Sequence, residues 1–341
     1  MEANFKMNNT EDKILFDQIH TTKKQMFLEN IMERTCREII KLGNTTPKSN
    51  SCPICESHAT EYFTEKFGFT LSRCTACEHI FCNPMPDKKQ LDYYYNSEMK
   101  DFENEFFMES FENRVPIFER RLEIIKQYIS SGKLLDVGSA IGIFLTAIER
   151  QNLAYELYSC DPSASACEQL KEKFRNVNTF QCMVEELNIP SYFDIITMWD
   201  TLEHVIDPVN VANKIHSLLK RDGFWFFSTP NTSSFEWMTA GKRHVQILPP
   251  GHINLFNPAS IKILLEKTGF DLIETYTLNG SLDISYVQKL LATDPSFQNS
   301  IGTFLSRHIG NCDFSDMFAK FLIQTRTAGN IFVVAQKRTN R

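Results

Sequence analysis

Residues 134–142 read LLDVGSAIG and contain an apolar run, an acidic residue and two glycines. The apolar residues up to Val137 are typical of a buried strand, and Gly138 and Gly142 permit the backbone of a tight turn. The run IGIFLTAIER that overlaps and follows it has the pattern of a helix. Free N–H groups at such a helix start favour an anionic or polar ligand. The stretch therefore predicts a strand, a ligand-binding turn and a helix.

The same alternation of strand and helix continues to the end of the chain. Short apolar runs typical of strands are separated by helical patterns. The apolar runs are ELYSC at 156–160, FDIITMW at 193–199, FWFFST at 224–229 and IFVVAQK at 331–337. Weaker strands are expected near 179–182 and 271–276. Alternation of this kind predicts a doubly wound α/β fold whose mainly parallel sheet is covered by helices on both faces. Residues 281–328 look helical and interrupt the pattern.

Two acidic residues flank the glycine turn. Asp136 precedes Gly138 by two positions, and Asp161 ends the next strand. An acid at the second position can accept both hydroxyls of a ribose. The spacing differs from the dinucleotide fingerprint G-x-G-x-x-G, which needs no acid before its first glycine. Because ligands of parallel sheets bind at the carboxyl ends of the strands, we predict a nucleoside ligand at this turn.

Four cysteines form two C-x-x-C pairs with eighteen residues between them, and they are Cys52, Cys55, Cys74 and Cys77. A single pair is also typical of a redox site, but two pairs at this spacing are typical of a zinc ribbon. Four thiolates make a closed tetrahedral site that stabilises a small fold without taking part in catalysis. We predict Zn²⁺ here, with iron as the competing ion.

Composition and charge restrict the class of protein. The net charge of −6 and the absence of long runs of like charge argue against a broad nucleic-acid surface. The chain contains no run of eighteen apolar residues, so no membrane span is predicted. The N-terminus also lacks the pattern of a secretory signal, and we therefore expect a cytoplasmic protein.

Residues 12–42 have a helical pattern. We expect this helix either to pack on the body of the protein or to serve as a contact in a homodimer.

Several motifs resemble class I S-adenosylmethionine-dependent methyltransferases, over roughly residues 90–340. LLDVGSAIGIFL resembles their first motif, and YSCDPS at 158–163 resembles the motif that ends their second strand. FDII at 193–196, LEHV at 202–205 and HINLF at 252–256 resemble a subgroup that includes sugar C-methyltransferases and ubiquinone-type O-methyltransferases. The resemblance implies a seven-stranded Rossmann-like sheet and S-adenosylmethionine as cofactor.

The resemblance also implies site residues. Those expected at the cofactor are Asp136, Gly138, Ser139, Ala140, Gly142, Asp161, Pro162, Met183, Val184 and Asp200. Many relatives have an acid for the adenine where this chain has Met183-Val184, so a backbone N–H of Val184 is the expected substitute. His204 is the predicted general base, although it has an alternative role in holding a loop. Glu203 either orients His204 or caps the following turn, and His252 is expected on the same rim, facing the substrate.

These observations predict three regions. Residues 1–50 form a helical extension, residues 51–90 a zinc ribbon, and residues 91–341 a methyltransferase domain with a helical insert at 281–328. The expected reaction is methyl transfer to a small-molecule acceptor, such as a sugar nucleotide or a glycan or natural-product precursor. The long C-terminal domain of sugar C-methyltransferases is absent, which argues against sugar C-methylation. Two alternatives remain: an RNA methyltransferase that uses its zinc ribbon to hold nucleic acid, and a non-catalytic binding module.

Overall fold

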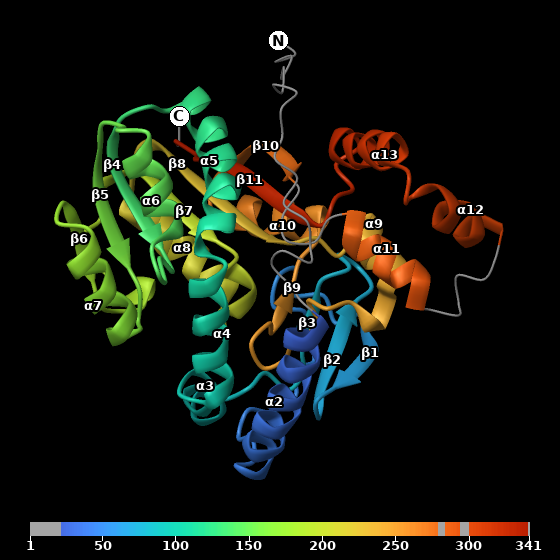
Figure 1. The fold of residues 1–341 in the computed structure, drawn as a ribbon. Helices are drawn as coiled ribbons and strands as arrows, with labels where there is room; N and C mark the ends of the chain where they lie inside the picture. Colours follow the sequence, from blue (N-terminus) through green and yellow to red (C-terminus); the bar gives the residue numbers. More distant parts are fainter. Residues whose placement is uncertain (1–21, 279–283, 294–299, 340–341) are drawn as a thin grey trace.

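The structure of the chain, a computed structural model, describes residues 22–278, 284–293 and 300–339. The first described helix is α2 (Thr22–Lys41), so residues 12–21 of the predicted N-terminal helix lie outside the described residues. The buried face of α2 contacts β2 (Phe69–Cys74), α3 (Lys88–Tyr95) and α4 (Glu98–Glu109), through a cluster made by Ile31, Met32, Cys36, Ile39, Phe69, Tyr94 and Met99. The helix therefore packs on the body of the protein (Figure 1).

Seven strands form the main sheet. Their order is β10 (Phe270–Leu278), β11 (Asn330–Lys337), β8 (Leu219–Pro230), β7 (Phe193–Trp199), β4 (Gly132–Val137), β5 (Tyr155–Cys160) and β6 (Val177–Phe180). The strands from β8 to β6 are parallel, whereas β11 is antiparallel to both of its neighbours. The sheet therefore confirms the predicted doubly wound, mostly parallel, seven-stranded fold. The strand order reverses between β4 and β7, which places a ligand crevice at the carboxyl ends of these strands.

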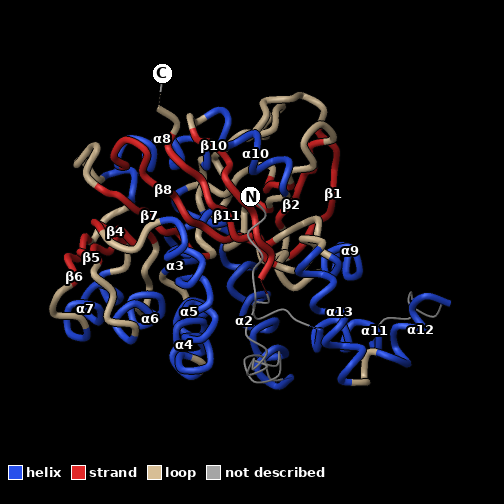
Figure 2. Tube along the Cα trace, turned by 90° about the horizontal axis from the view of Figure 1, so that it is seen from above, coloured by secondary structure: helices blue, strands red, loops and turns tan. Residues whose placement is uncertain are grey.

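Helices cover both faces of this sheet. Figure 2 shows α5 (Phe111–Tyr128), α6 (Ile143–Arg150) and α7 (Ala164–Lys173) on one side and α8 (Pro208–Leu218) and α10 (Pro258–Lys267) on the other. Successive residues of a strand point to opposite faces. One buried cluster accordingly contains Leu134, Ile195 and Phe226, and the other contains their neighbours Leu135, Ile196 and Phe227. Burial on both faces explains why the strands are continuous apolar runs in the sequence.

A second, smaller sheet contains β1 (Thr60–Lys66), β2, β3 (Ile80–Cys82) and β9 (Asn254–Leu255). Its fourth strand comes from the region predicted to form the larger domain. The cysteines Cys52, Cys74 and Cys77 also share a buried cluster with Phe256 and with Leu264 of α10. The four-cysteine module and the main sheet are thus joined by one continuous core, wherever a boundary is drawn in the sequence.

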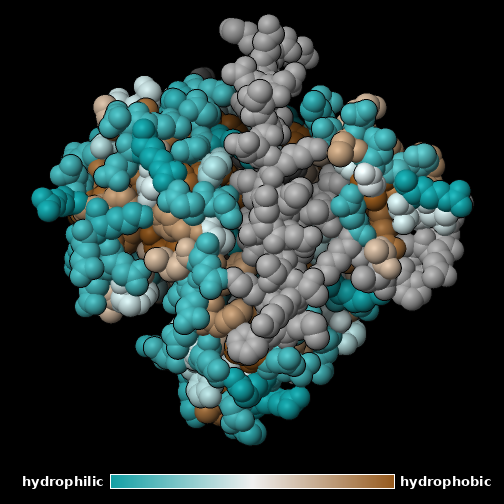
Figure 3. Space-filling model, in the orientation of Figure 1, coloured by the Kyte–Doolittle hydropathy of each residue, from teal (hydrophilic) through white to brown (hydrophobic). Residues whose placement is uncertain are grey.

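The remaining helices lie at the edges. The short helix α9 (Phe235–Ala240) follows β8, and the predicted insert contains α11 (Ile284–Thr293), α12 (Ser300–His308) and α13 (Cys312–Gln324). Residues 281–283 and 294–299 of that insert lie outside the described residues. In the view of Figure 3, hydrophilic residues dominate the described surface. None of the described helices is both long and apolar enough to span a lipid bilayer.

Candidate active site

The turn after β4 has an unusual backbone. Gly138, Ala140 and Gly142 have φ angles of 72°, 44° and 75°, in the left-handed region that favours glycine. A Cβ atom on Gly138 would lie 2.6 Å from the hydroxyl oxygen of Thr201, which follows β7. Ala140 adopts the left-handed conformation although its Cβ disfavours it. The turn is therefore pressed closely against the segment that leaves β7.

Asp161, at the end of β5, is tied to this turn. Its Oδ2 atom accepts a 2.9 Å hydrogen bond from the backbone N–H of Ala140, and its Oδ1 atom accepts a 2.8 Å bond from the N–H of Ser163. The side chain is buried, and burial raises the pKa of its carboxyl while the two N–H donors lower it. The carboxylate thus lies directly at the turn, as the sequence predicts.

Asp136 is a second buried carboxyl at the same edge of the sheet. Its Oδ1 atom accepts a 2.7 Å hydrogen bond from the hydroxyl of Thr197, on β7. Burial raises the pKa of Asp136 to about 7, and the Thr197 bond opposes this rise. The Ser139 hydroxyl donates to the backbone carbonyl of Asp136 at 2.7 Å, so its side chain holds the turn. Two carboxyls at neighbouring strand ends favour a ligand that carries positive charge.

The other predicted cofactor residues lie around this edge of the sheet. Pro162 follows Asp161 and is exposed. Met183 is exposed, whereas the Val184 side chain is buried at the start of the short helix η1 (Val184–Glu186), which follows β6. Asp200 follows β7, and its carboxylate accepts a 2.8 Å hydrogen bond from the Asn330 amide. The roles of these four residues toward a cofactor stay predictions.

Glu203, His204 and His252 converge from two separate loops. Glu203 and His204 belong to the short helix η2 (Leu202–His204) after β7, and His252 precedes β9. One ligand atom from each of the three lies within 4.8 Å of the others. The rings of His204 and His252 meet edge to face, with centroids 4.7 Å apart. The structure therefore brings together all three residues that the sequence assigns to catalysis.

Hydrogen bonds orient this trio. The hydroxyl of Thr229 donates to Oε2 of Glu203 at 3.0 Å. His252 Nδ1 lies 2.9 Å from the backbone carbonyl of Gln246, and because a carbonyl only accepts, Nδ1 must carry the proton. That tautomer leaves Nε2 of His252 as an acceptor or metal ligand. His204 Nδ1 is buried without a hydrogen-bond partner among the residues that the structure describes.

Burial sets the charge state of the trio. It raises the pKa of Glu203 well above its usual range, and the nearby Asp200 carboxylate raises it further. Burial and the neighbouring His252 lower the pKa of His204 well below 6.5, and burial also lowers the pKa of His252. Both imidazoles are therefore neutral at pH 7 and available to accept a proton or a metal ion.

A cavity of about 210 Å³ borders the trio. One side is polar and is formed by Glu203, His204, His252, Asp200 and Arg114. Helices α2, α3 and α4 and a loop contribute mainly apolar or aromatic side chains, with Glu103 as an acidic exception: Met32, Tyr94, Met99, Phe102, Phe106 and Leu248. This arrangement suits a small molecule with an apolar body and a polar group directed at His204.

Arg121 of α5 is a candidate site residue that the sequence analysis missed. It is buried, its Nη2 atom lies 3.2 Å from Oδ2 of Asp200, and its guanidinium covers the rings of Phe118 and Trp199. Its Nε and Nη1 atoms are buried without partners among the described residues. A signal was present, since Ile117, Arg121 and Ile125 recur at intervals of four and place a cation within an apolar helix face.

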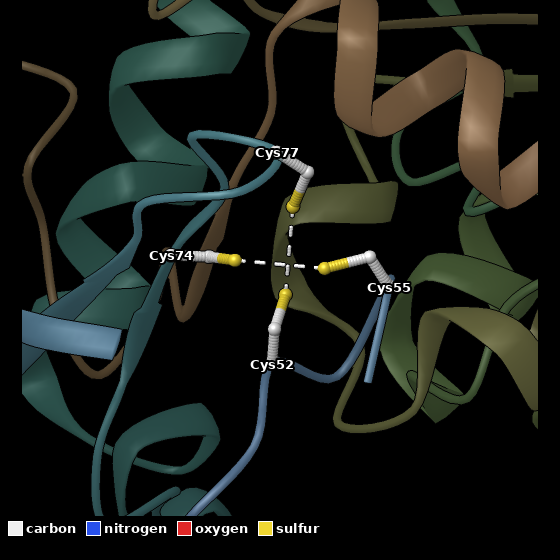
Figure 4. A group of neighbouring side chains, drawn as sticks. All are labelled: Cys52, Cys55, Cys74 and Cys77. Carbon is white, nitrogen blue, oxygen red and sulfur yellow. Dashed lines mark hydrogen bonds between the residues drawn. The ribbon is translucent and has the colours of Figure 1, made fainter. Parts of the chain in front are cut away.

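The four cysteines of the N-terminal module surround one point. Their sulfur atoms face each other from two loops (Figure 4), with distances of 3.6 Å between Cys52 and Cys77 and 3.5 Å between Cys55 and Cys74. Tetrahedral zinc with bonds of about 2.3 Å needs sulfur atoms about 3.8 Å apart. A hydrogen bond from Cys77 lowers the pKa of Cys52 to about 5, whereas the same bond raises the pKa of Cys77. Each thiol therefore opposes the ionisation of its neighbour. A bound divalent cation would allow all four cysteines to be thiolates.

Known proteins resemble this chain. A methyltransferase-domain family matches residues 108–275. The chain is 28% identical over 189 residues to a ubiquinone biosynthesis O-methyltransferase of Neisseria meningitidis serogroup C, covering 48% of this chain and 78% of that protein. It is 30% identical over 168 residues to the ubiquinone biosynthesis O-methyltransferase of Albidiferax ferrireducens, and the match covers 46% of this chain and 67% of that protein. The chain belongs to the class I S-adenosylmethionine-dependent methyltransferases.

This methyltransferase also resembles solved structures. One is a SAM-dependent methyltransferase from Archaeoglobus fulgidus, with 17% sequence identity, 68% of this chain and 98% of that chain covered, and a TM-score of 0.45. Membership of the class gives the methyltransferase S-adenosylmethionine as its cofactor and places the chain among enzymes.

Gly138→Ala should weaken both folding and cofactor binding. A non-glycine residue in the left-handed region costs about 1–2 kcal/mol, and the clash with Thr201 adds to this. We expect at least this loss in urea unfolding, together with weaker binding of S-adenosylhomocysteine in calorimetry. Gly310→Ala is the matched control, because no atom lies within 4 Å of its added Cβ. Wild-type stability and affinity in Gly138→Ala would contradict the geometry of the turn.

Proposed function

We propose that this methyltransferase methylates a hydroxyl group of a small molecule held in the cavity beside His204. The observation that carries the proposal is the convergence of Glu203, His204 and His252 on the polar side of that cavity. The names of the relatives, ubiquinone biosynthesis O-methyltransferases, support oxygen as the atom that is methylated.

The proposed cofactor site lies at the carboxyl ends of β4 and β5. Asp161 would accept the ribose hydroxyls, beside the turn from Gly138 to Gly142. S-adenosylmethionine carries a sulfonium and an ammonium, so the buried carboxyls of Asp136 and Asp161 suit its positive charge. Arg121, whose Nε and Nη1 atoms lack partners among the described residues, would pair with the carboxylate of the methionine part.

The proposed mechanism assigns a proton to His204. S-adenosylmethionine supplies a methyl group already activated by its sulfonium, so the protein mainly needs to align the acceptor. The neutral His204 would take the hydroxyl proton as the oxygen–methyl bond forms and the sulfur–methyl bond breaks. Glu203 and His252 would hold His204 in place, because the three side chains lie against one another on the polar side of the cavity.

The cavity wall favours one class of acceptor. Because Met32, Phe102, Phe106 and Leu248 contribute apolar surface, the acceptor would carry an aromatic or otherwise apolar body beside its hydroxyl. A sugar nucleotide is mostly polar, so this wall supports it less well. Transfer of labelled methyl groups to a panel of phenols, catechols and sugar nucleotides tests this assignment. Turnover with sugar nucleotides alone would overturn it.

The trio also supports a second mode of activation. Two imidazole nitrogens and a carboxylate within 4.8 Å of one another can bind a divalent cation. A cation there would lower the pKa of a bound acceptor hydroxyl and would replace the histidine as the source of activation. The two modes differ in their response to a chelator, which is used in the last prediction of this subsection.

The four-cysteine module is proposed to bind Zn²⁺ in a structural role. Its sulfur distances support a tetrahedral ion, and four thiolates leave no open position for a substrate. The net charge of −6 argues against the alternative in which this module holds RNA. The polar trio beside the cavity argues against a non-catalytic module.

One equivalent of Zn²⁺ should accompany each chain. Cys77→Ser should release the ion and lower the melting temperature, because the module shares its buried core with α10. Metal analysis and thermal unfolding measure both effects. The exposed Cys312 gives the control, and Cys312→Ser should change neither. Wild-type protein prepared without chelators that contains far less than one equivalent would refute the zinc assignment.

Asp161→Ala should weaken S-adenosylhomocysteine binding by about 5- to 150-fold, because unmatched partners of a buried acceptor cost about 1–3 kcal/mol. Calorimetry measures the affinity directly. Asp271→Ala removes an exposed carboxylate from β10 and should leave the affinity unchanged. Equal affinities in wild type and Asp161→Ala would show that the ribose lies elsewhere.

His204→Ala should lower turnover by about 10²–10⁴-fold while cofactor affinity stays nearly constant. Because the pKa of His204 is held well below 6.5, activity should be complete at pH 7 and fall as the pH drops through that pKa. The variant should lose this dependence. Measurements require an acceptor from the panel described above.

A chelator distinguishes the two modes of activation. If His204 acts as a base, EDTA at a concentration that leaves the cysteine-bound zinc in place should not reduce the rate. If a cation acts at the trio, EDTA should abolish turnover and Mg²⁺ or Zn²⁺ should restore it. Near-normal turnover in His204→Ala would contradict both modes and leave alignment alone as the catalytic device.

A further inference from the structure

A buried hydrogen-bonded link joins the four-cysteine module to the turn that carries Glu203 and His204. His79 Nε2 lies 3.0 Å from Oδ1 of Asn254, and the Asn254 Nδ2 atom donates to the backbone carbonyl of Val205 at 2.7 Å. Both linking side chains are fully buried, at 0% exposure. Because the Val205 carbonyl can only accept, Nδ2 must face it, so Oδ1 faces His79 and His79 Nε2 carries the proton.

His79 is fixed to the second cysteine pair. Its backbone carbonyl accepts a 2.8 Å hydrogen bond from the N–H of Cys74, directly beside the Cys74–Cys77 loop. Its ring packs against Phe81 and Phe256, with centroid distances of 6.0 and 4.7 Å. The ring therefore faces Asn254 from a fixed position, with its Nε2 atom as the donor.

The backbone next to Asn254 forms a second connection between the module and the turn. The Ile253 N–H donates to the carbonyl of Glu203 at 2.9 Å, and the Ile253 carbonyl accepts from the N–H of Cys82 at 2.9 Å. His252 immediately precedes this residue. One short segment, residues 252–255, therefore carries a member of the trio and is bonded both to the module and to the turn with the other two.

The turn itself has little internal support. The helix η2 contains only three residues, and its internal backbone bond joins the His204 N–H to the carbonyl of Thr201 at 3.0 Å. A single turn of this kind is not stable alone, so its position depends on bonds from outside. Beside the Thr229 bond to Glu203, they include the bonds from Ile253 and Asn254, which connect the turn to the four-cysteine module.

We propose that His79 and Asn254 are positioning residues, and that the four-cysteine module serves the reaction by holding the catalytic turn and His252 in mutual alignment. This rests on the proposed role of His204 in methyl transfer. Alignment is the main contribution that methyl transfer needs from the protein, and a displacement of about 1 Å can reduce a rate by about 10²-fold. The module then acts on catalysis without contacting the acceptor.

The test compares four variants of the full chain. His79→Phe keeps a ring between Phe81 and Phe256 but removes the donor, whereas His79→Gln restores an N–H donor of similar reach. Asn254→Ala removes both hydrogen bonds of the link. Arg73→Ala is the control, because it removes an exposed ion pair with Glu78 in the same module without touching the link.

The first measurement needs no acceptor. In ¹⁵N-histidine-labelled protein saturated with S-adenosylhomocysteine, the ring signals of His204 and His252 should shift in His79→Phe and Asn254→Ala. They should return toward wild-type positions in His79→Gln and stay unchanged in Arg73→Ala. Zinc content and S-adenosylhomocysteine affinity should match wild type in all four. Unshifted signals in His79→Phe and Asn254→Ala would overturn the proposal, as would equal shifts in Arg73→Ala.

The second measurement uses a catechol as the hydroxyl-bearing probe. His79→Phe and Asn254→Ala should lower kcat by about 10–100-fold with little change in KM, and His79→Gln should recover most of this loss. A loss of kcat that His79→Gln fails to recover would overturn the positioning role. Absence of turnover in the wild type with every acceptor of the panel would instead count against the proposed function, and the histidine signals would still decide the link.

Discussion

The hydrogen bond from the backbone N–H of Ala140 to the Asp161 carboxylate joins the ends of two neighbouring parallel strands, and the arrangement of this edge of the sheet depends on it. It holds a left-handed turn that alanine would otherwise disfavour, and it directs a buried acid toward the place where strand order reverses. The 2.8 Å bond from the N–H of Gly138 to the carbonyl of Cys160 reinforces the same junction. Once these two strand ends are fixed, the next strand, β7, delivers its own polar residues to the same edge.

Much of this edge could be predicted because parallel strands end together. Asp136, Asp161 and the Glu203–His204 pair each follow an apolar run, so the sequence alone brings them to one side of the sheet. The convergence of the four cysteines could also be predicted, since two C-x-x-C pairs at this spacing are typical of a zinc ribbon. The left-handed conformation of Ala140 was harder to predict. Alanine disfavours this conformation, and the hydrogen bond to Asp161 outweighs that preference.

Other features depend on contacts between distant parts of the chain. The cavity wall is built from α2, α3, α4 and a loop near Leu248, and amphipathic helices do not specify which neighbour they cover. The strand β9 has only two residues, too few for any periodic pattern, yet it completes a sheet begun far earlier in the chain. The burial of Arg121 could have been predicted, because it is a cation in an apolar helix face. Its pairing with Asp200 could not have been predicted from the sequence.

The late origin of β9 bears on how the chain is made. His79 and Asn254 are 175 positions apart, and a ribosome that adds about 5–20 residues per second needs about 9–35 s to travel that distance. Throughout this interval both cysteine pairs have been synthesised, whereas β9, the strand that pairs with β3, has not. An unpaired strand edge invites wrong pairing. Binding of a metal ion by the four thiols would let the four-cysteine module fold before β9, which completes its sheet, has been synthesised.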